Sequence, residues 1–158
     1  MGEIHVRAPL FDRLTDLDPW AGEERRPLRT FGRDGLLESV RRELERLLNT
    51  RSSLPVDRLE ERDDLTVLEY GIPDLSAFSA GEPEDQKRLA GVVTRAVSAF
   101  EPRLRDVRTV FERLDETGRE VQLRVDAVLT LDEVREPVSF PTIFTVKTGE
   151  VRVGLLDG

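Results

Sequence analysis

The sequence predicts an α+β fold in which two long helices pack on a C-terminal antiparallel β-meander, forming two layers. In two segments before Phe100, apolar residues recur with the helical period of about 3.6 residues. From Leu104 onward the period changes to about 2, which indicates strands with one buried and one solvated face. Because helices followed by consecutive strands are typical of α+β domains, these two observations together favour this class.

Residues 1–34 are predicted to form an N-terminal arm, because prolines and glycines interrupt this segment repeatedly. One short helical patch remains over residues 10–17, where apolar side chains share one face. An apolar patch on a polar arm suggests docking, either on the chain's own domain or on a partner. The candidate contact residues are Leu10, Phe11 and Leu14.

Residues 35–158 are predicted to form a single α+β domain. Its first helix is expected from about Leu36 to Leu48, with an apolar stripe opposite a charged face. The acid-rich residues 57–64 are expected to form a surface loop. Residues 65–70 are expected to form a short helix closed by Gly71, because glycine suits a helix end.

The second long helix is expected to begin near Pro83, since proline suits the first helical position. It should end at about Phe100 or Glu101, because Pro102 disfavours helical dihedral angles in the residue before it. Strands are expected after it over residues 104–111, 121–131, 138–146 and 151–155, with turns at residues 115–119 and 148–149.

Length and composition favour one domain and exclude several kinds of site. The chain has 158 residues and a net charge of −8, which argues against a general nucleic-acid binder. It has no cysteine and a single histidine, His5, so a thiol nucleophile is excluded and a catalytic triad or histidine-rich zinc site is hard to build. We therefore expect no cofactor and no metal, and composition alone names no function.

Neither a membrane span nor an export signal is predicted. No segment approaches the roughly 20 apolar residues that cross a bilayer, and acids stand near the start where an export signal would be basic and then apolar. The sequence thus predicts a soluble protein, most simply cytoplasmic, without membrane insertion.

Phe100-Glu101-Pro102-Arg103-Leu104 lies where the second helix is expected to meet the first strand. A glutamate at a helix C-terminus faces the negative end of the helix dipole, which costs up to about 1 kcal/mol unless a nearby cation compensates the negative charge. Arg103, just beyond the rigid Pro102, is the obvious local cation. Two interpretations remain: a corner that grips another chain or pins the first strand, and a helix end with a chance ion pair.

Four motifs in this order and spacing resemble a known family. They are Leu10-Phe11-Asp12-Arg13-Leu14, Leu47-Leu48-Asn49-Thr50-Arg51, Tyr70-Gly71-Ile72-Pro73-Asp74-Leu75 and Phe100-Glu101-Pro102-Arg103-Leu104. The sequence resembles the TssE subunit of the type VI secretion baseplate, a relative of the small wedge protein of contractile phage tails that was once labelled lysozyme-like. The resemblance extends from about Pro9 to Val153. It departs from the family at Ile72, where leucine is commoner.

The resemblance implies a structural, non-enzymatic subunit in the cytoplasmic baseplate wedge. Its partners would be the wedge subunits TssF, TssG and TssK and the sheath subunits TssB and TssC, with six copies per baseplate. The sheet would be offered to the first sheath ring, so that sheath polymerisation starts at the baseplate. The characteristic Glu-Pro-Arg motif corresponds to Glu101, Pro102 and Arg103, which are therefore candidate partner-binding residues.

Strand addition supplies a mechanism, because the edge strands of a meander carry unpaired backbone groups that an incoming peptide can bind. The sequence leaves open which edge is free, and whether Arg103 contacts a partner or braces the fold.

Two alternative functions remain. One is the equivalent wedge subunit of a phage-like contractile particle, and the other is a peptidoglycan muramidase, although 32 acidic residues will place some pair at glycosidase spacing by chance.

Overall fold

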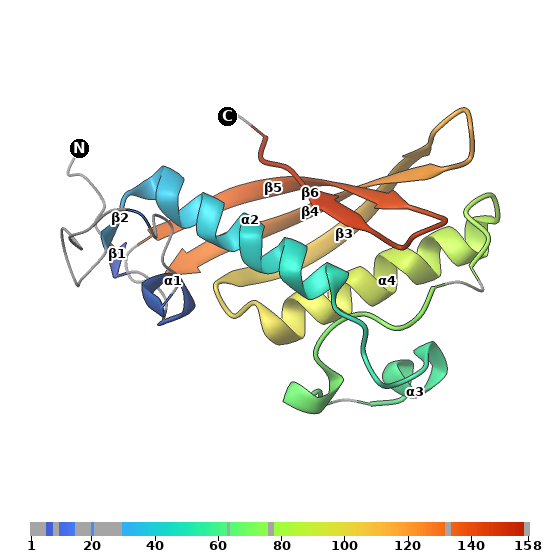
Figure 1. The fold of residues 1–158 in the computed structure, drawn as a ribbon, viewed down its shortest axis with the longest axis horizontal. Coiled ribbons are helices and arrows are strands. Elements are labelled where there is room, and N and C mark those ends of the chain that lie inside the picture. The colour runs from blue at the N-terminus through green and yellow to red at the C-terminus, as the bar shows by residue number, and fades with distance from the viewer. Residues whose placement is uncertain are drawn as a thin grey trace.

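A computed structural model describes residues 6–7, 10–14, 20, 30–62, 64–75, 78–131 and 134–156. Within these ranges the α+β class is confirmed, with four α-helices and a four-stranded antiparallel sheet (Figure 1). The helical elements are α1 (Leu10–Leu14), α2 (Arg33–Asn49), α3 (Val56–Glu60), the 3-10 turn η1 (Val67–Glu69) and α4 (Pro83–Phe100). The strands are β1 (Val6–Arg7), β2 (Thr30–Phe31), β3 (Leu104–Leu114), β4 (Glu120–Leu131), β5 (Val134–Thr145) and β6 (Val151–Val153).

The strand order β3-β4-β5-β6 is the predicted meander, in which each strand pairs antiparallel with the next. Figure 1 shows α2 and α4 lying across one face of this sheet, where α4 contacts β3 and α2 contacts β6. Leucines and valines of both helices form one core with the helix-facing residues of β4. The prediction omitted the small second sheet, in which β1 pairs with β2.

The long helices agree closely with the predicted spans. Helix α4 begins at Pro83 and ends at Phe100, with Glu101 as its C-terminal cap. Helix α2 starts at Arg33 rather than Leu36, since its first turn is polar and carries no apolar signal. Among the described residues, no helix is long and apolar enough to cross a bilayer.

The expected surface loop over residues 57–64 is wrong in its first part, which belongs to α3. Val56 and Leu59, three residues apart, are 9% and 5% exposed, so this single turn is held by packing that the acidic composition conceals. The expected short helix before Gly71 is a 3-10 turn, η1. A capping box fixes it: the Glu69 carboxylate accepts from Thr66 N (2.7 Å), and the Thr66 hydroxyl accepts from Leu68 N (3.3 Å).

The segment around Gly71 fastens the end of α2. Ile72 forms a parallel bridge with Arg51, with hydrogen bonds from Ile72 N to Thr50 O (2.9 Å) and from Ser52 N to Ile72 O (2.8 Å). Gly71 has a φ of +111°, and a Cβ there would lie 2.4 Å from Thr50 O. Only glycine therefore allows this close backbone approach.

The sheet follows the predicted alternation most closely in β4, where alternate residues from Val121 to Leu129 are buried. Strand β3 is less regular: its pairing with β4 shifts twice, and Asp106 in the first shift has a φ of +53°. Strand β5 starts at Val134 rather than residue 138, and the predicted turn at residues 148–149 is confirmed by the positive φ of Gly149.

Candidate partner-binding site

Glu101 caps α4 and is almost completely buried. Its backbone N–H donates to Val97 O (2.9 Å), while its carbonyl accepts from Leu104 N (3.1 Å) as the chain turns into β3. The residue is 3% exposed. A buried carboxylate at the negative end of a helix dipole requires a cation and hydrogen-bond donors.

Arg103 supplies these donors. Its Nε donates to Oε1 of Glu101 (2.8 Å) and its Nη2 donates to Oε2 (2.6 Å), which makes a two-pronged ion pair. The Arg103 backbone N–H also donates to Oε1 (3.2 Å). The Arg103 and Glu101 side chains are only 10% and 4% exposed. The ion pair expected from the sequence is therefore present, and it lies inside the protein.

The corner is connected to the sheet and to α2. The Arg103 carbonyl accepts from Thr130 N (2.7 Å) near the end of β4, and Arg103 Nη1 donates to Ser39 Oγ (2.9 Å) in α2. Ser39 is fully buried within the apolar stripe of α2. One arginine thus links the α4–β3 turn, the neighbouring strand and the other long helix.

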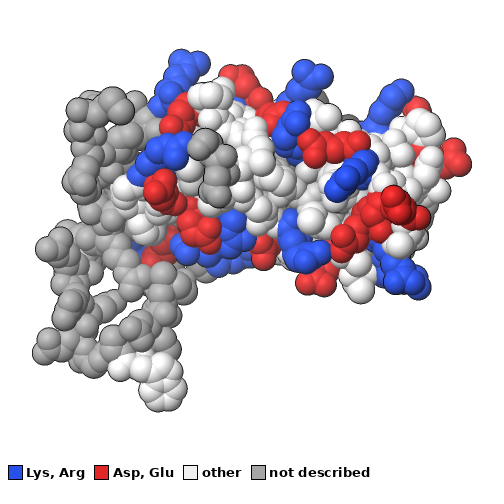
Figure 2. All heavy atoms as spheres, turned by 90° about the horizontal axis from the view of Figure 1, so that it is seen from above, with Lys and Arg blue, Asp and Glu red and all other residues white. Residues whose placement is uncertain are grey.

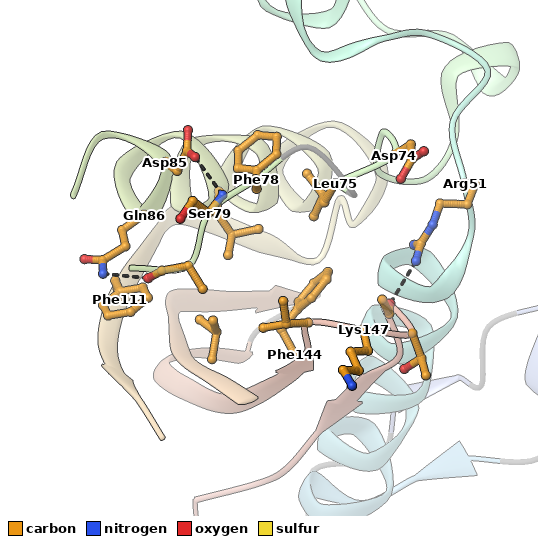
Figure 3. A pocket seen from close by; sticks show the side chains of 16 residues that line it. Arg51, Asp74, Leu75, Phe78, Ser79, Asp85, Gln86, Phe111, Phe144 and Lys147 are labelled. Carbon is orange, nitrogen blue, oxygen red and sulfur yellow. Dashed lines mark hydrogen bonds between the residues drawn. The ribbon is translucent and has the colours of Figure 1, made fainter. Parts of the chain in front are cut away.

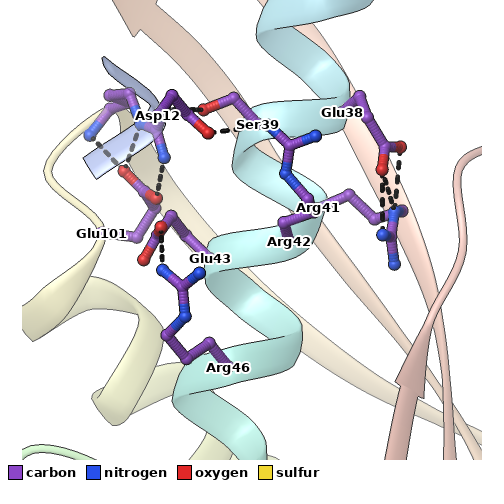
Figure 4. A network of polar contacts seen from close by, with 9 residues as sticks. Asp12, Glu38, Ser39, Arg41, Arg42, Glu43, Arg46 and Glu101 are labelled. Atoms are coloured by element: carbon purple, nitrogen blue, oxygen red, sulfur yellow. Dashed lines mark hydrogen bonds and ion pairs between the residues drawn. The ribbon is translucent and has the colours of Figure 1, made fainter. Parts of the chain in front are cut away.

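The network continues into the N-terminal segment (Figure 4). Ser39 Oγ donates to Oδ2 of Asp12 in α1 (2.5 Å), and Arg42 Nη2 donates to the other Asp12 oxygen (2.7 Å). Asp12 is 11% exposed in its side chain. Two carboxylates and two guanidinium groups are joined through one hydroxyl, so the formal charges balance. We call Asp12, Ser39, Arg42, Glu101 and Arg103 the corner network.

Two further ion pairs, both partly exposed, lie on different sides of α2 in Figure 4. Arg41 bonds to Glu38 at 2.9 Å, and Arg46 lies beside Glu43. Hydrogen bonds from Arg41 hold the pKa of the Glu38 carboxyl below its ordinary value. Their exposure means that such pairs contribute little stability compared with the corner network.

The other predicted contact residues lie at the surface or outside the described side chains. Pro102 is exposed between the two buried charged residues. Leu14 is 74% exposed at the end of α1, while nothing is described of the Leu10 and Phe11 side chains. The predicted remainder of the patch, residues 15–17, lies outside the described residues. Asp12, rather than these apolar residues, is the residue of α1 that is shown to be bonded to the Glu-Pro-Arg corner, through Ser39.

Sequence reasoning missed Ser39 and Asp12 as members of the network. The available signal for Ser39 was a hydroxyl within the apolar stripe of a helix, since a buried hydroxyl needs partners. Asp12 had a weaker signal, as the acid inside the Leu-Phe-Asp-Arg-Leu motif. Nothing local indicates that residues 27 positions apart bond to each other.

One edge of the sheet is closed by side chains of α2. Asn49 exchanges two hydrogen bonds with the Val151 backbone (2.8 and 2.9 Å). Arg41 donates to Val153 O (3.0 Å), and Glu45 accepts from Val153 N (3.3 Å). These side chains occupy the outward-facing backbone groups of β6, as a neighbouring strand would.

The first part of β5 extends beyond β6. Strand β5 pairs with β4 along its length, but the β6 ladder reaches only Thr142, Ile143 and Phe144. Gly154 N donates to Pro141 O (2.7 Å), so the backbone groups of Pro141 face the β6 side. Since backbone direction alternates along a strand, those of Ser139 and Pro137 face the same side. Prolines at such positions are typical of sheet edges.

A cavity of about 160 Å³ lies where the start of α4 meets the end of the sheet (Figure 3). Phe78 and Leu75 approach it from the loop before α4, and Phe111 and Phe144 approach it from the sheet. Two polar groups on its rim fasten that loop: Asp85 accepts from Ser79 N (2.7 Å), and Gln86 donates to Ala80 O (2.9 Å). The cavity thus combines apolar side chains with polar groups, some of which bond to the loop backbone.

Charges of both signs are mixed over the face in Figure 2, without a continuous basic stripe. In the part of the chain that the structure describes, no cluster of histidines and acids is arranged to hold a metal ion.

These features define a class: a small α+β domain in which a buried helix–proline–strand corner joins a meander to an N-terminal segment. Residues 34–134 match the sequence profile of the baseplate wedge protein gp25 family. The chain belongs to this family, which is also the TssE family, so the predicted resemblance is confirmed. The family is one of structural baseplate proteins. The matched span contains the Glu-Pro-Arg corner and the Gly71 segment.

Comparisons with curated proteins and with solved structures gave no significant match.

Proposed function

We propose that the chain is the wedge subunit of a type VI secretion baseplate that connects the other wedge subunits to the contractile sheath. In this role it starts sheath polymerisation by accepting a sheath strand at an edge of its meander. The family match supports a baseplate role. The observation that carries the finer proposal is the first half of β5 beside the corner network, which pairs with β4 but with no second strand among the described residues.

Arg103 acts in this proposal as an internal brace. Its guanidinium makes two hydrogen bonds to Glu101 and one to Ser39, and the side chain is only 10% exposed, so little of it is accessible to a partner. Because its carbonyl also holds Thr130 near the β4–β5 connection, it fixes the part of the sheet that precedes the open edge. The exposed Pro102 is the member of the motif that is available for direct contact.

Strand β5 is the edge that accepts the sheath. The β6 edge is occupied by α2 side chains. The β3 edge is distorted at Asp106, and α4 uses one of its donors, because Thr109 N bonds to Thr94 Oγ1 (3.1 Å). A bulge and bonded groups both oppose strand addition. Residues 135–139 have neither obstacle among the described residues. Pro137 has no N–H, so Arg135 and Ser139 supply the backbone donors of this edge.

The arm docks on the other wedge subunits TssF, TssG and TssK through Leu10, Phe11 and Leu14. Asp12 belongs to the corner network and fixes the orientation of α1, while Leu14 remains exposed for a partner. Six copies around a cytoplasmic baseplate would convert weak individual contacts with TssB and TssC into a firm platform through effective concentration.

The experiment is sheath assembly in cells with a fluorescent TssB, comparing Arg103→Ala with Arg46→Ala on the charged face of α2. Both variants remove one arginine, but only the first disturbs the corner network. We expect assembly to be lost in Arg103→Ala and retained in Arg46→Ala. Equal assembly at equal protein levels would contradict the assigned role of the corner.

The wedge subunit of a phage-like contractile particle is the second candidate, because the family profile covers phage baseplate proteins. Purification from native cells distinguishes the two. Recovery of TssB and TssC supports type VI secretion, whereas recovery of a phage-type sheath and tube supports the particle.

A further inference from the structure

A second surface lies on the side of α4 that faces α3 and η1, away from the corner network. It is a groove of about 540 Å³ between α4 and the segment of residues 59–73, which loops below α4 in Figure 1. Leu59, Leu65 and Pro73 form one wall, and α4 residues from Glu84 to Ala96 form the other. We call it the α4 groove.

Gly91 leaves the middle of this groove open. It is an exposed glycine inside a long helix, and a Cβ placed on it would have no atom within 4 Å. Glycine in a helix interior is unfavourable relative to alanine, and no packing contact within the protein requires it here. Its absent side chain allows another chain to approach the helix backbone closely.

The groove is basic although the chain is acidic. Lys87, Arg88 and Arg95 line it with one acid, Glu84, whereas the chain as a whole has a net charge of −8. Lys87 pairs with Glu84 and Arg88 pairs with Asp57 of α3, so Arg95 is the cation on which recognition of an acid depends. Arg95 Nε is buried, and it has no hydrogen-bond partner among the described residues. A buried donor without a partner is unfavourable, so a carboxylate entering the groove would complete its bonding.

Two exposed apolar side chains follow Leu65 closely in the chain. Val67 and Leu68 are 84% and 76% exposed, yet they lie in the η1 turn, which the Thr66–Glu69 capping box holds rigid. Arg62 also donates to Glu69 (2.9 Å). Two exposed apolar residues on a rigid support are typical of a docking site, since little entropy is lost when they are covered.

We propose that the α4 groove binds an acidic segment of a partner protein. A carboxylate of that segment pairs with Arg95, a small or apolar residue passes over Gly91, and further apolar residues cover Val67 and Leu68. This surface is separate from the β5 edge and the corner network. The proposal therefore stands or fails independently of the sheath-binding role.

The test is selection of random 12-residue peptides on the immobilised full-length protein, followed by fluorescence anisotropy of the enriched peptide. We expect enriched sequences in which Asp or Glu lies beside apolar residues. Arg95→Gln should weaken their binding by about tenfold or more, as expected for loss of a hydrogen bond to a charged group. Gly91→Leu, which fills open space, should abolish it while the protein remains folded by circular dichroism.

Two controls make the test decisive. Arg58→Gln removes an exposed arginine outside the groove and should leave the affinity unchanged. Arg95→Lys should retain part of it. Failure to enrich any peptide, enrichment of basic peptides, undiminished binding to Gly91→Leu, or displacement of the peptide by a single-stranded oligonucleotide at equal concentration would each overturn the proposal.

Discussion

Arg103 and Glu101 form the most consequential pair of residues in the fold. Removing one partner of a buried ion pair leaves the other charge without compensation, which typically costs about 3–5 kcal/mol. We expect Arg103→Ala to lower the free energy of unfolding by about this amount, as measured by urea denaturation. Replacing both residues, in Glu101→Leu with Arg103→Met, should recover most of it, because the unpaired charge is gone.

Arg103→Ala and the doubly substituted protein together distinguish an internal bracing role of Arg103 from a direct contact with a partner. If Arg103→Ala keeps full stability but loses sheath assembly, the arginine contacts a partner directly. If the doubly substituted protein regains both stability and assembly, the brace interpretation holds.

Gly71 is a second residue whose identity is fixed by geometry. Gly71→Ala combines an unfavourable φ with a contact of 2.4 Å to Thr50 O. Strain at such positions costs about 1–3 kcal/mol, and the contact adds to it. Gly118→Ala is the matched control, because Gly118 has a φ of +66° but no atom within 4 Å of the added Cβ. Thermal unfolding should show a clearly larger decrease in Tm for Gly71→Ala; equal decreases would refute the role of the close approach.

Asp115 makes the β3–β4 turn sensitive to acid. Its carboxylate accepts from Glu120 N and Arg119 N (both 2.7 Å) and from Thr117. Hydrogen bonds from Glu120 and then Thr117 lower its pKa from 3.8 to about 2. A lowered folded-state pKa means that this stabilisation is complete above the ordinary pKa and is lost as the pH falls toward 2.

Asp115→Asn should therefore be less stable than the wild type at pH 7, and the difference should shrink between pH 4 and pH 2. Urea denaturation at several pH values measures it. A difference that does not change with pH would show that the carboxylate charge is irrelevant to the turn.

At the scale of elements, α4 was predictable because its signals are local: proline opens it and proline follows its cap. Strand β4 was predictable because its alternation is uninterrupted. The start of β5 was not, since Pro137 resembles a strand breaker until the structure places it on an edge. Likewise, α3 depends on the burial of Val56 and Leu59, which composition does not reveal.

If a sheath strand pairs with the first half of β5, the backbone N–H of Ser139 should be needed for sheath assembly. Ser139 N–H faces the open side between two prolines, so Ser139→Pro should remove the donor that a sheath strand uses. Ser139→Ala is the control, because both substitutions lose the hydrogen bond from Ser139 Oγ to Asp126 (2.6 Å) but only proline loses the N–H. We expect sheath assembly to fail in Ser139→Pro and to persist in Ser139→Ala. Equal assembly in the two variants would exclude this edge.

At the scale of the whole molecule, the corner network connects parts that are far apart in sequence. Four motifs were sufficient to indicate the family, and the Glu101–Arg103 pair was predicted from its local spacing. The extension through Ser39 to Asp12 was not predictable, because it depends on how α2 packs against the α4–β3 turn. Tertiary packing also decided which sheet edge is closed, through side chains of Asn49, Glu45 and Arg41.

The most direct test of the central claim is site-specific cross-linking to the sheath. Because the chain has no cysteine, a single introduced thiol is unique. Arg135→Cys places it at the β5 edge, and Arg113→Cys places it on β3; both positions are exposed. Each variant carries a short thiol-to-amine cross-linker and is mixed with purified TssB and TssC under assembly conditions. We predict a sheath adduct from Arg135→Cys alone, whereas an adduct from Arg113→Cys alone, or from neither variant while assembly proceeds, would contradict sheath initiation at β5.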